Sequence, residues 1–176
     1  TLDYKNARQI VQTLVECVSK NGNLLLNVGP KGDGSIPEED VKILKEIGCW
    51  MQKNKAAIYG SRPWKKDSEG PTKIPEGQFT DNEELPYTKE DIRFVVNEDS
   101  VYAFVMNFPK DGHVVIRSLS ESKNQNSMAF HGLIEEVKIL GYENVPLTWS
   151  RDKKGLYVTA CGIETDMPVT VQVRMK

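Results

Sequence analysis

The sequence is poor in the residues that cross-link chains or hold metals. Its 176 residues include three cysteines, Cys17, Cys49 and Cys161, and two histidines, His113 and His131. The cysteines lack the paired spacing of a zinc site, and neither histidine lies near a Cys pair. We therefore expect no metal site. We expect the cysteines to be buried free thiols that behave as small apolar residues.

Charge of one sign is not in excess, and long apolar runs are absent. The chain has 23 Lys and Arg against 25 Asp and Glu, a balance that does not favour nucleic acid or an anionic membrane as a partner. No run approaches the about 20 apolar residues that span a bilayer. The glycine-rich stretch from Gly29 to Gly34 has neither the P-loop ending nor the dinucleotide spacing. We therefore expect no membrane partner, no nucleic-acid partner and no cofactor.

Residues 22–64 carry the most informative pattern. The apolar run at 23–28 is too short for a helix and is bounded by Gly22 on one side and Gly29-Pro30 on the other, so it predicts a strand. Three consecutive leucines leave neither face of this strand polar. Such a strand is typical of a parallel sheet that is covered on both faces.

Two helices are expected on either side of this strand. Before it, apolar residues recur at helical spacing from Tyr4 to Val18, with Asp3 as a plausible cap and Gly22 at positive φ as the stop. After it, Ser35 and Glu38 have capping-box spacing and predict the start of the second helix. This helix should bury the residues that recur every three or four positions, Val41, Leu44, Ile47, Gly48 and Met51, and Ile43 and Trp50 should widen the buried face.

The stretch GNLLLNVGPKGDGSIPEE and the later IYGSRPW closely resemble the end of the catalytic barrel of glycoside hydrolase family 29, the α-L-fucosidases. In that family the first pattern is the eighth strand and helix of a (β/α)8-type barrel, and the second leads into a C-terminal β-sandwich. The resemblance implies an α+β fragment, a helix–strand–helix barrel end followed by an antiparallel β-sandwich. The expected limits are 1–64 for the barrel end, 65–90 for an irregular linker and 91–176 for the sandwich.

The residues after position 91 also predict β structure without the resemblance. Short strand-like runs separated by turn signals indicate an antiparallel sandwich. Between 101 and 106 both alternating faces are apolar, which predicts a central strand. Strands are expected at 92–96, 101–106, 113–117, 134–140, 148–150, 156–159 and 169–174.

Trp64, before the linker, is expected to plug a domain interface rather than to stack on a sugar.

The resemblance implies an activity that this chain would not carry alone. A complete barrel needs about 250 residues, so a chain of 176 residues is expected to be the C-terminal piece of a retaining exo-enzyme that removes terminal α-L-fucose from glycans. The family's Asp nucleophile and Glu acid/base lie in earlier parts of its barrel, and no position here matches either motif. The expected partners are therefore the remainder of the barrel and a fucosylated glycan. We expect no catalytic residue in this piece and no activity from it alone.

The end of the predicted strand is the part of the chain that could reach a substrate, because barrel active sites lie at the carboxyl ends of the strands. Asn27, Gly29 and Pro30 are the candidate substrate-binding residues, as part of the wall of the barrel mouth or as support behind it. For Asn27, hydrogen bonds to neighbouring loops are favoured over direct contact with the sugar. Asp33 lies in the same region, but a turn-forming role in its Gly-Asp-Gly sequence explains it better than catalysis.

An alternative function is that the sandwich is a non-catalytic carbohydrate-binding or protein-interaction module. A binding groove of that kind would need several exposed aromatic side chains on one sheet. Trp149, Tyr142 and Tyr157 are the candidates, although such residues are more often part of the core.

Two further expectations follow from the resemblance. A lone strand at 23–28 has unpaired backbone groups on both edges, so it should pair with a second chain, join the sandwich or be poorly ordered. The family is commonly secreted, periplasmic or lysosomal, which predicts a location outside the cytoplasm.

Overall fold

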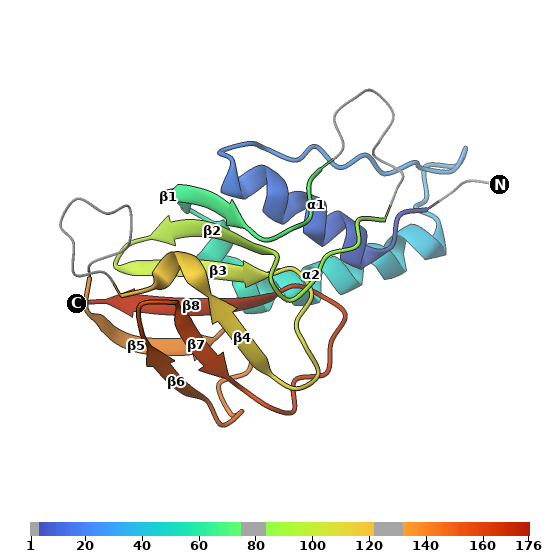
Figure 1. Ribbon diagram of the computed structural model, residues 1–176. Coiled ribbons are helices and arrows are strands. Elements are labelled where there is room, and N and C mark those ends of the chain that lie inside the picture. Colours follow the sequence, from blue (N-terminus) through green and yellow to red (C-terminus); the bar gives the residue numbers. More distant parts are fainter. Residues whose placement is uncertain (1–3, 75–83, 122–131) are drawn as a thin grey trace.

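The computed structural model describes residues 4–74, 84–121 and 132–176, which form an α+β fold. Two helices, α1 (Ala7–Ser19) and α2 (Glu38–Ile58), come first, and the strands follow them. The helices lie against one face of a five-stranded sheet, and a three-stranded sheet lies against the other face (Figure 1). The described part of the chain is therefore layered as helices, sheet and sheet.

The two sheets are antiparallel throughout the described residues. The larger has the order β1-β2-β3-β8-β5 and the smaller the order β4-β7-β6. A short 3-10 turn, Arg117–Leu119, follows β4. The bounds of the strands are β1 (Arg62–Glu69), β2 (Ile92–Asn97), β3 (Ser100–Val105), β4 (His113–Ile116), β5 (Ile134–Ile139), β6 (Thr148–Arg151), β7 (Leu156–Thr159) and β8 (Val169–Met175).

Strand β3 is buried along its whole length, as the sequence predicted for a central strand. Val101, Ala103 and Val105 belong to the core between the two sheets. Tyr102 and Phe104 belong to a second core, between the larger sheet and the helices. Because successive side chains of a strand point to opposite faces, a strand that is covered on both sides needs apolar residues at consecutive positions.

The helix layer is fixed to the larger sheet by packing and by a hydrogen bond. Val11 and Val15 of α1 and Trp50 of α2 belong to the core on this face of the sheet. The Trp50 and Phe104 ring centroids are 6.2 Å apart. The indole Nε1–H of Trp50 donates to the Pro168 carbonyl at 2.7 Å, which satisfies the polar end of a buried ring.

The seven strands predicted after position 91 are confirmed as β2 to β8. The prediction of an irregular linker from position 65 differs from the structure, because β1 continues to Glu69 and pairs with β2 across an irregularity between Pro63 and Ser68. β1 is an edge strand. Edge strands tolerate proline and charged residues, so the polar composition that suggested a linker is compatible with this position.

The ends of α1 differ from the predicted ones in detail. Asn6 caps the helix: its Oδ1 accepts from the Gln9 N–H at 2.8 Å, and Gln9 Oε1 accepts from the Asn6 N–H at 2.9 Å. The predicted cap, Asp3, lies outside the described residues. At the other end Asn21, with φ of 63°, takes the left-handed conformation that was predicted for Gly22. Asparagine is one of the few residues that adopt this conformation readily.

The capping box predicted for α2 is wrong. Pro37 is the N-cap residue and no side chain caps this end. The Ser35 hydroxyl instead donates to Asp33 Oδ1 at 2.6 Å. A serine beside an acidic turn residue can bond locally instead of to the helix, and spacing alone does not show which of these bonds forms.

The buried face predicted for α2 is also wrong in part. Trp50 is buried as predicted, together with Asn54 and Ala57. The other residues that were predicted to be buried are only partly buried here: Val41, Ile43, Leu44, Ile47, Gly48 and Met51. The helix therefore has a second apolar stripe that the larger sheet does not fully cover.

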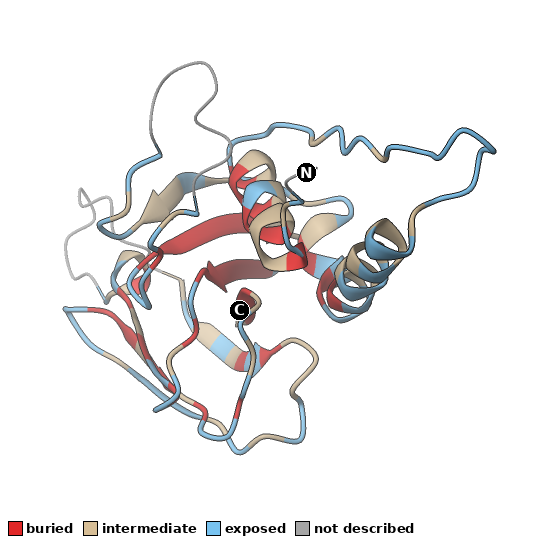
Figure 2. Ribbon diagram, turned by 90° about the vertical axis from the view of Figure 1, so that its right-hand side faces the viewer, coloured by how far each residue is buried: buried red, intermediate tan, exposed pale blue. Residues whose placement is uncertain are grey.

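Residues 23–28 do not form the predicted strand and join neither sheet. The segment runs out from the end of α1 and returns to α2 with most of its residues exposed (Figure 2). Leu25 is 96% exposed. A strand exists through hydrogen bonds to a neighbour, and the described residues provide none here. Pairing with a second chain therefore stays a prediction.

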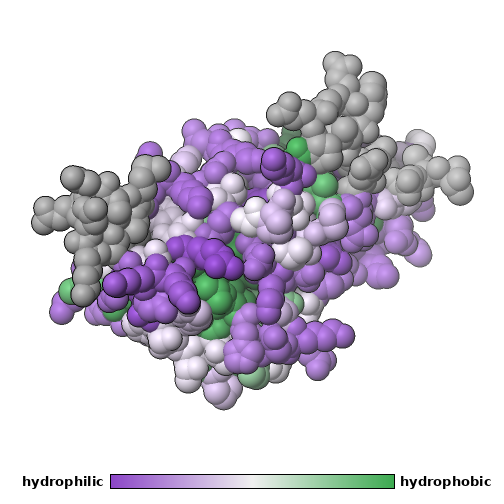
Figure 3. Space-filling view, in the orientation of Figure 1, coloured by the Kyte–Doolittle hydropathy of each residue, from purple (hydrophilic) through white to green (hydrophobic). Residues whose placement is uncertain are grey.

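The surface offers two simple observations. Hydrophilic side chains cover most of the face seen in Figure 3, with a hydrophobic patch where β4 lies in Figure 1. Neither described helix combines the length and the low charge that crossing a bilayer would need.

Candidate functional site

The three candidate substrate-binding residues lie together on an open cavity of about 640 Å³. Asn27, Gly29 and Pro30 form part of one wall. The cavity lies at the N-terminal ends of α1 and α2, and most of its lining is apolar: Tyr4, Ile10, Leu26, Val28, Pro37, Ile43 and Leu44. In a repeated strand–helix unit the helix begins near the carboxyl end of the preceding strand. In a barrel this is the end that carries the active site.

The charged groups of this cavity can bind a ligand, but they cannot complete a mechanism that needs two carboxylates. Among the described residues that line it, Lys5, Lys31 and Asp40 carry charge. Retaining glycoside hydrolysis requires two carboxyl groups about 5 Å apart, one as nucleophile and one as acid/base. Asp40 supplies one carboxylate, so the described lining is suited to form a wall of a site and not its reacting centre.

Asp33 forms a turn, as the sequence predicted. Its Oδ1 accepts from the Ser35 N–H at 2.9 Å and from the Ser35 hydroxyl. The turn is closed by the Gly34 N–H, which donates to the Lys31 carbonyl at 2.9 Å. The hydrogen bonds from Ser35 lower the pKa of Asp33. The carboxylate therefore stays ionised, the opposite of what a general acid needs.

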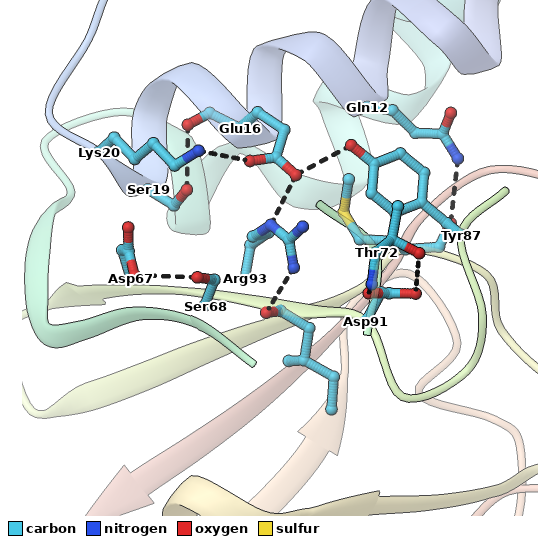
Figure 4. A network of polar contacts seen from close by, with 12 residues as sticks. Gln12, Glu16, Ser19, Lys20, Asp67, Ser68, Thr72, Tyr87, Asp91 and Arg93 are labelled. Atoms are coloured by element: carbon cyan, nitrogen blue, oxygen red, sulfur yellow. Dashed lines mark hydrogen bonds and ion pairs between the residues drawn. The ribbon is translucent and has the colours of Figure 1, made fainter. Parts of the chain in front are cut away.

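A network of buried polar groups joins α1 to the larger sheet (Figure 4). The Arg93 Nε–H, on β2, donates to Glu16 Oε1 at 2.6 Å, and the Tyr87 hydroxyl donates to the same oxygen at 2.9 Å. Lys20 Nζ lies 3.2 Å from the other carboxylate oxygen. Glu16 is 7% exposed and Arg93 is 3% exposed. Charges buried to this extent need a partner and further hydrogen bonds.

The rest of the network is also well partnered. Arg93 Nη1 donates to the carbonyls of Glu69 and Ile92 at 3.2 and 3.1 Å. Burial, together with the negative charge of Glu16, raises the pKa of Tyr87, so its hydroxyl remains a hydrogen-bond donor. Because Glu16, Tyr87 and Arg93 are all buried, the network positions α1 on the sheet and does not face a ligand.

A second buried carboxylate holds the two flanks of the connection between β1 and β2. Asp91 accepts from the N–H and hydroxyl of Thr72 at 2.8 Å each, and from those of Thr88 at 2.7 and 2.9 Å. Burial opposes ionisation, but the hydrogen bonds from Thr88 and Thr72 outweigh it and lower the pKa of Asp91. Gly70 has φ of 118°, and a Cβ there would lie 2.5 Å from the Asp91 Cα. The close packing at this point therefore requires glycine.

The thiols and histidines form no site in the described part of the chain. Cys49 and Cys161 are exposed and Cys17 is partly buried, so the expectation of three buried thiols is wrong. The His113 ring Nδ1 lies 3.0 Å from the Thr159 hydroxyl, and His131 lies outside the described residues. No group of three potential metal ligands occurs among the residues described.

The aromatic side chains that were considered for sugar binding differ in how they are placed. The Trp64 ring lies 5.0 Å from that of Phe94 and packs, partly buried, against the core between the sheets. Its expected role as a plug at a domain interface stays a prediction. Trp149 on β6 is 40% exposed and lines an open groove of about 360 Å³ together with Tyr142. Tyr157 is not among the residues that line this groove.

No pattern in the sequence predicts the buried network. Glu16 shares the buried face of α1 with the polar residues Gln12 and Ser19, so the helical pattern does not mark it as a buried charge. Its partner Arg93 is 77 positions away, and one charged residue in a β pattern does not reveal a partner at that distance. The predicted residues Asn27, Gly29 and Pro30, which are close in sequence, could be placed together from the chain alone.

Comparison with known proteins gives two family matches that follow each other along the chain. The model described as Alpha-L-fucosidase matches residues 1–56, and the model described as Alpha-L-fucosidase C-terminal domain matches residues 83–172. The second match covers more than half of the 176 residues. Between them the two matches include α1, nearly all of α2 and most of the strands.

Individual relatives agree with these matches. An α-L-fucosidase of Dictyostelium discoideum is 37% identical over 131 residues, which are 74% of this chain and 24% of that protein. Plasma α-L-fucosidase of Rattus norvegicus is 30% identical over 94% of this chain and 29% of that protein. The Thermotoga maritima α-fucosidase structure matches with a TM-score of 0.70 and 26% identity, over 98% of this chain and 35% of that chain. That enzyme has also been solved in complex with fucose. The chain thus spans about a quarter to a third of the length of these relatives.

Proposed function

This chain belongs to the α-L-fucosidase family, and we propose that the protein carrying it is a retaining exo-α-L-fucosidase that hydrolyses terminal α-L-fucose from glycans. The chain would be the C-terminal part of that enzyme. The observation that carries the proposal is the cavity wall formed by Asn27, Gly29 and Pro30 at the N-terminal ends of two helices, in a chain of this family. The complex of a relative with fucose supports a fucosylated glycan as the ligand.

In this proposal the chain has three parts. Residues 1–64 are the last part of a (β/α)8-type catalytic barrel, 65–90 connect it to the next domain, and 91–176 are the C-terminal β-sandwich. The incompletely covered apolar stripe of α2 and the exposed Leu25 and Leu26 support this division. The β-strands and helices of a barrel would cover both, and the segment at 23–28 would become the eighth strand once a neighbouring strand lies beside it.

The proposed contribution of this piece to catalysis is structural. The nucleophile and the acid/base belong to the remainder of the barrel, because the described lining of the cavity offers one carboxylate, that of Asp40. Asn27, Gly29 and Pro30 would form part of the wall beside the sugar or support that wall from behind. The β-sandwich would hold α1 and α2 in place through the core beneath the helices and through the Glu16–Arg93 pair.

The test is hydrolysis of an aryl α-L-fucoside by the full-length protein, by the 176-residue chain and by the chain mixed with the missing part of the barrel. We expect activity from the full-length protein and from the mixture, and none from the chain alone. Nuclear magnetic resonance of the first product should show α-L-fucose, since double displacement retains configuration. An inactive full-length protein, or a first product of β configuration, would contradict the proposal. An aryl β-D-galactoside is the control substrate.

We also propose a location outside the cytoplasm, in the periplasm, a lysosome or the medium. The names of relatives, which include plasma and tissue α-L-fucosidases, support this. Fractionation of cells that express the full-length protein from its own gene tests it, and recovery in the cytoplasmic fraction alone would contradict it.

A further inference from the structure

We propose that the groove between β5 and β6 binds a neutral saccharide, with the indole of Trp149 as a stacking platform and Glu143 as a hydrogen-bond acceptor. The groove lies at one open edge of the two packed sheets, since β5 and β6 are edge strands of the larger and the smaller sheet. This site is separate from the cavity at Asn27 and does not depend on the proposed hydrolytic activity.

The position of Trp149 is unusual for a residue on the inner face of a sheet. It lies opposite Val158 in the pairing of β6 with β7. Opposite residues of an antiparallel pair project from the same face, and Val158 is 1% exposed in the core between the sheets. Trp149 therefore projects from the same face, but at the edge of the sheet, and remains 40% exposed. The ring therefore keeps an exposed apolar area that a bound ligand would remove from water.

The floor of the groove is apolar and held in place. Tyr142, Val145 and Leu147 line it and also pack against the core between the two sheets. The Lys53 ammonium lies 4.9 Å from the Tyr142 ring centroid, which fixes that ring from the side of α2. The volume of about 360 Å³ lies within the range of small-ligand sites. A ligand would therefore meet a preformed surface.

The rim supplies a hydrogen-bond acceptor. Glu143 Oε1 accepts from the Gly141 N–H at 3.0 Å. Hydrogen bonds from its own backbone and from Gly141 lower the pKa of this carboxyl, so it remains an acceptor. Glu136 and Lys138 pair at 2.9 Å on the face of β5 opposite to Val137 and Ile139. The Glu143 carboxylate beside the aromatic platform matches sugar hydroxyls, which both donate and accept.

The charge of the groove favours a neutral ligand. Glu135, Glu136 and Glu143 line it, against Lys138. Arg174 pairs with Glu135 at 3.3 Å and with Glu136 at 3.1 Å, so most of the charge is already compensated. Together with Arg174, Lys138 and the Lys53 ammonium beside Tyr142 balance the three carboxylates, so the groove has no net charge that would select an ionic ligand. The apolar faces of a pyranose ring suit the exposed indole face.

The experiment is calorimetric titration of the full-length protein with lactose, cellotriose and mannotriose, and with sialyllactose as the anionic probe. We expect weak binding of at least one neutral sugar. Trp149→Ala should weaken it about tenfold, the loss typical of an aromatic anchor. Glu143→Gln should weaken it about threefold, because a charged acceptor is replaced by a neutral one. Tyr59→Ala removes another exposed aromatic side chain, 67% exposed and outside the groove, and should change nothing.

Several outcomes would overturn the proposal. These are no heat with any neutral sugar, unchanged binding by Trp149→Ala, tighter binding of sialyllactose than of lactose, or a dimer that Trp149→Ala dissociates while sugars do not bind. If Trp149→Ala does not fold, Trp149→Phe should keep part of the platform and bind with intermediate affinity. Hydrolysis of an aryl fucoside is measured on the same variants and should not change, so that failure at the groove is distinguished from failure of the proposed enzyme.

Discussion

The ion pair between Glu16 and Arg93 should be a major contributor to the attachment of α1 to the sheet. Glu16→Met removes the carboxylate and leaves the Arg93 guanidinium buried at 3% exposure, with the backbone carbonyls of Glu69 and Ile92 as its acceptors. Removing one partner of a buried pair typically costs about 3–5 kcal/mol. We expect Glu16→Met to lower the free energy of unfolding by this amount. For a protein of this size that corresponds to about 6–20 °C in Tm.

The double variant Glu16→Met with Arg93→Met gives the sharper result. It removes both charges and fills their space with apolar atoms, so it should be more stable than either single variant. The coupling energy from the double-mutant cycle should therefore be large for two side chains in contact. Lys20→Ala is the matched control, because this cation contacts the same carboxylate but its side chain is 46% exposed. Exposed pairs contribute about 1 kcal/mol or less.

The assay is urea unfolding followed by circular dichroism and by tryptophan fluorescence, with the free energy taken from the linear fit. Coincidence of the two transitions shows that a single unfolding step is measured. The reasoning is refuted if Glu16→Met costs less than Lys20→Ala. It is also refuted if the two single costs simply add in the double variant, since independent sites behave in that way.

Three further predictions concern other parts of the chain. Asp91→Asn should lower the free energy of unfolding at neutral pH. Because the folded-state pKa of Asp91 lies below its usual 3.8, this difference from wild type should persist down to about pH 5 and vanish as pH falls through the folded pKa. A difference that does not depend on pH would contradict the assignment. Gly70→Ala should lower the free energy of unfolding by about 1–3 kcal/mol through backbone strain alone. Urea unfolding measures this, and an unchanged urea midpoint would show that the chain relaxes there. Cys49 and Cys161 are exposed, so alkylation under native conditions, read by peptide mass spectrometry, should modify both well before Cys17, and equal rates would contradict the burial described.

The β strands were predictable because their signals are local. In β3 the apolar residues at consecutive positions, from Val101 to Val105, determine that both faces are covered, and no distant residue is needed to infer it. The same holds for the Asp33 turn, in which the partner Ser35 is two positions away. Features that rest on such short separations could be predicted from the sequence.

The wrong predictions concern features that depend on which parts of the protein lie beside a segment. The apolar residues of α2 show that two faces could be buried, but not that the larger sheet takes the face of Trp50, Asn54 and Ala57. The strand predicted at 23–28 has the right composition, but the partner that would give it hydrogen bonds is not in the described chain. Both errors have one origin, because a local pattern predicts that a surface needs a partner without identifying that partner.

The helix layer has a consequence for how the protein can be divided. Val11, Val15 and Trp50 lie in helices that the proposal assigns to the barrel, but their side chains are buried against the larger sheet. A cut near Trp64 would follow the proposed boundary in the sequence and still remove the cover from these side chains. The resulting catalytic domain would expose an apolar surface that favours aggregation. The proposed domain boundary would therefore divide the chain without separating two parts that are each stable alone. The proposed barrel should be produced only together with the sheets that cover α1 and α2.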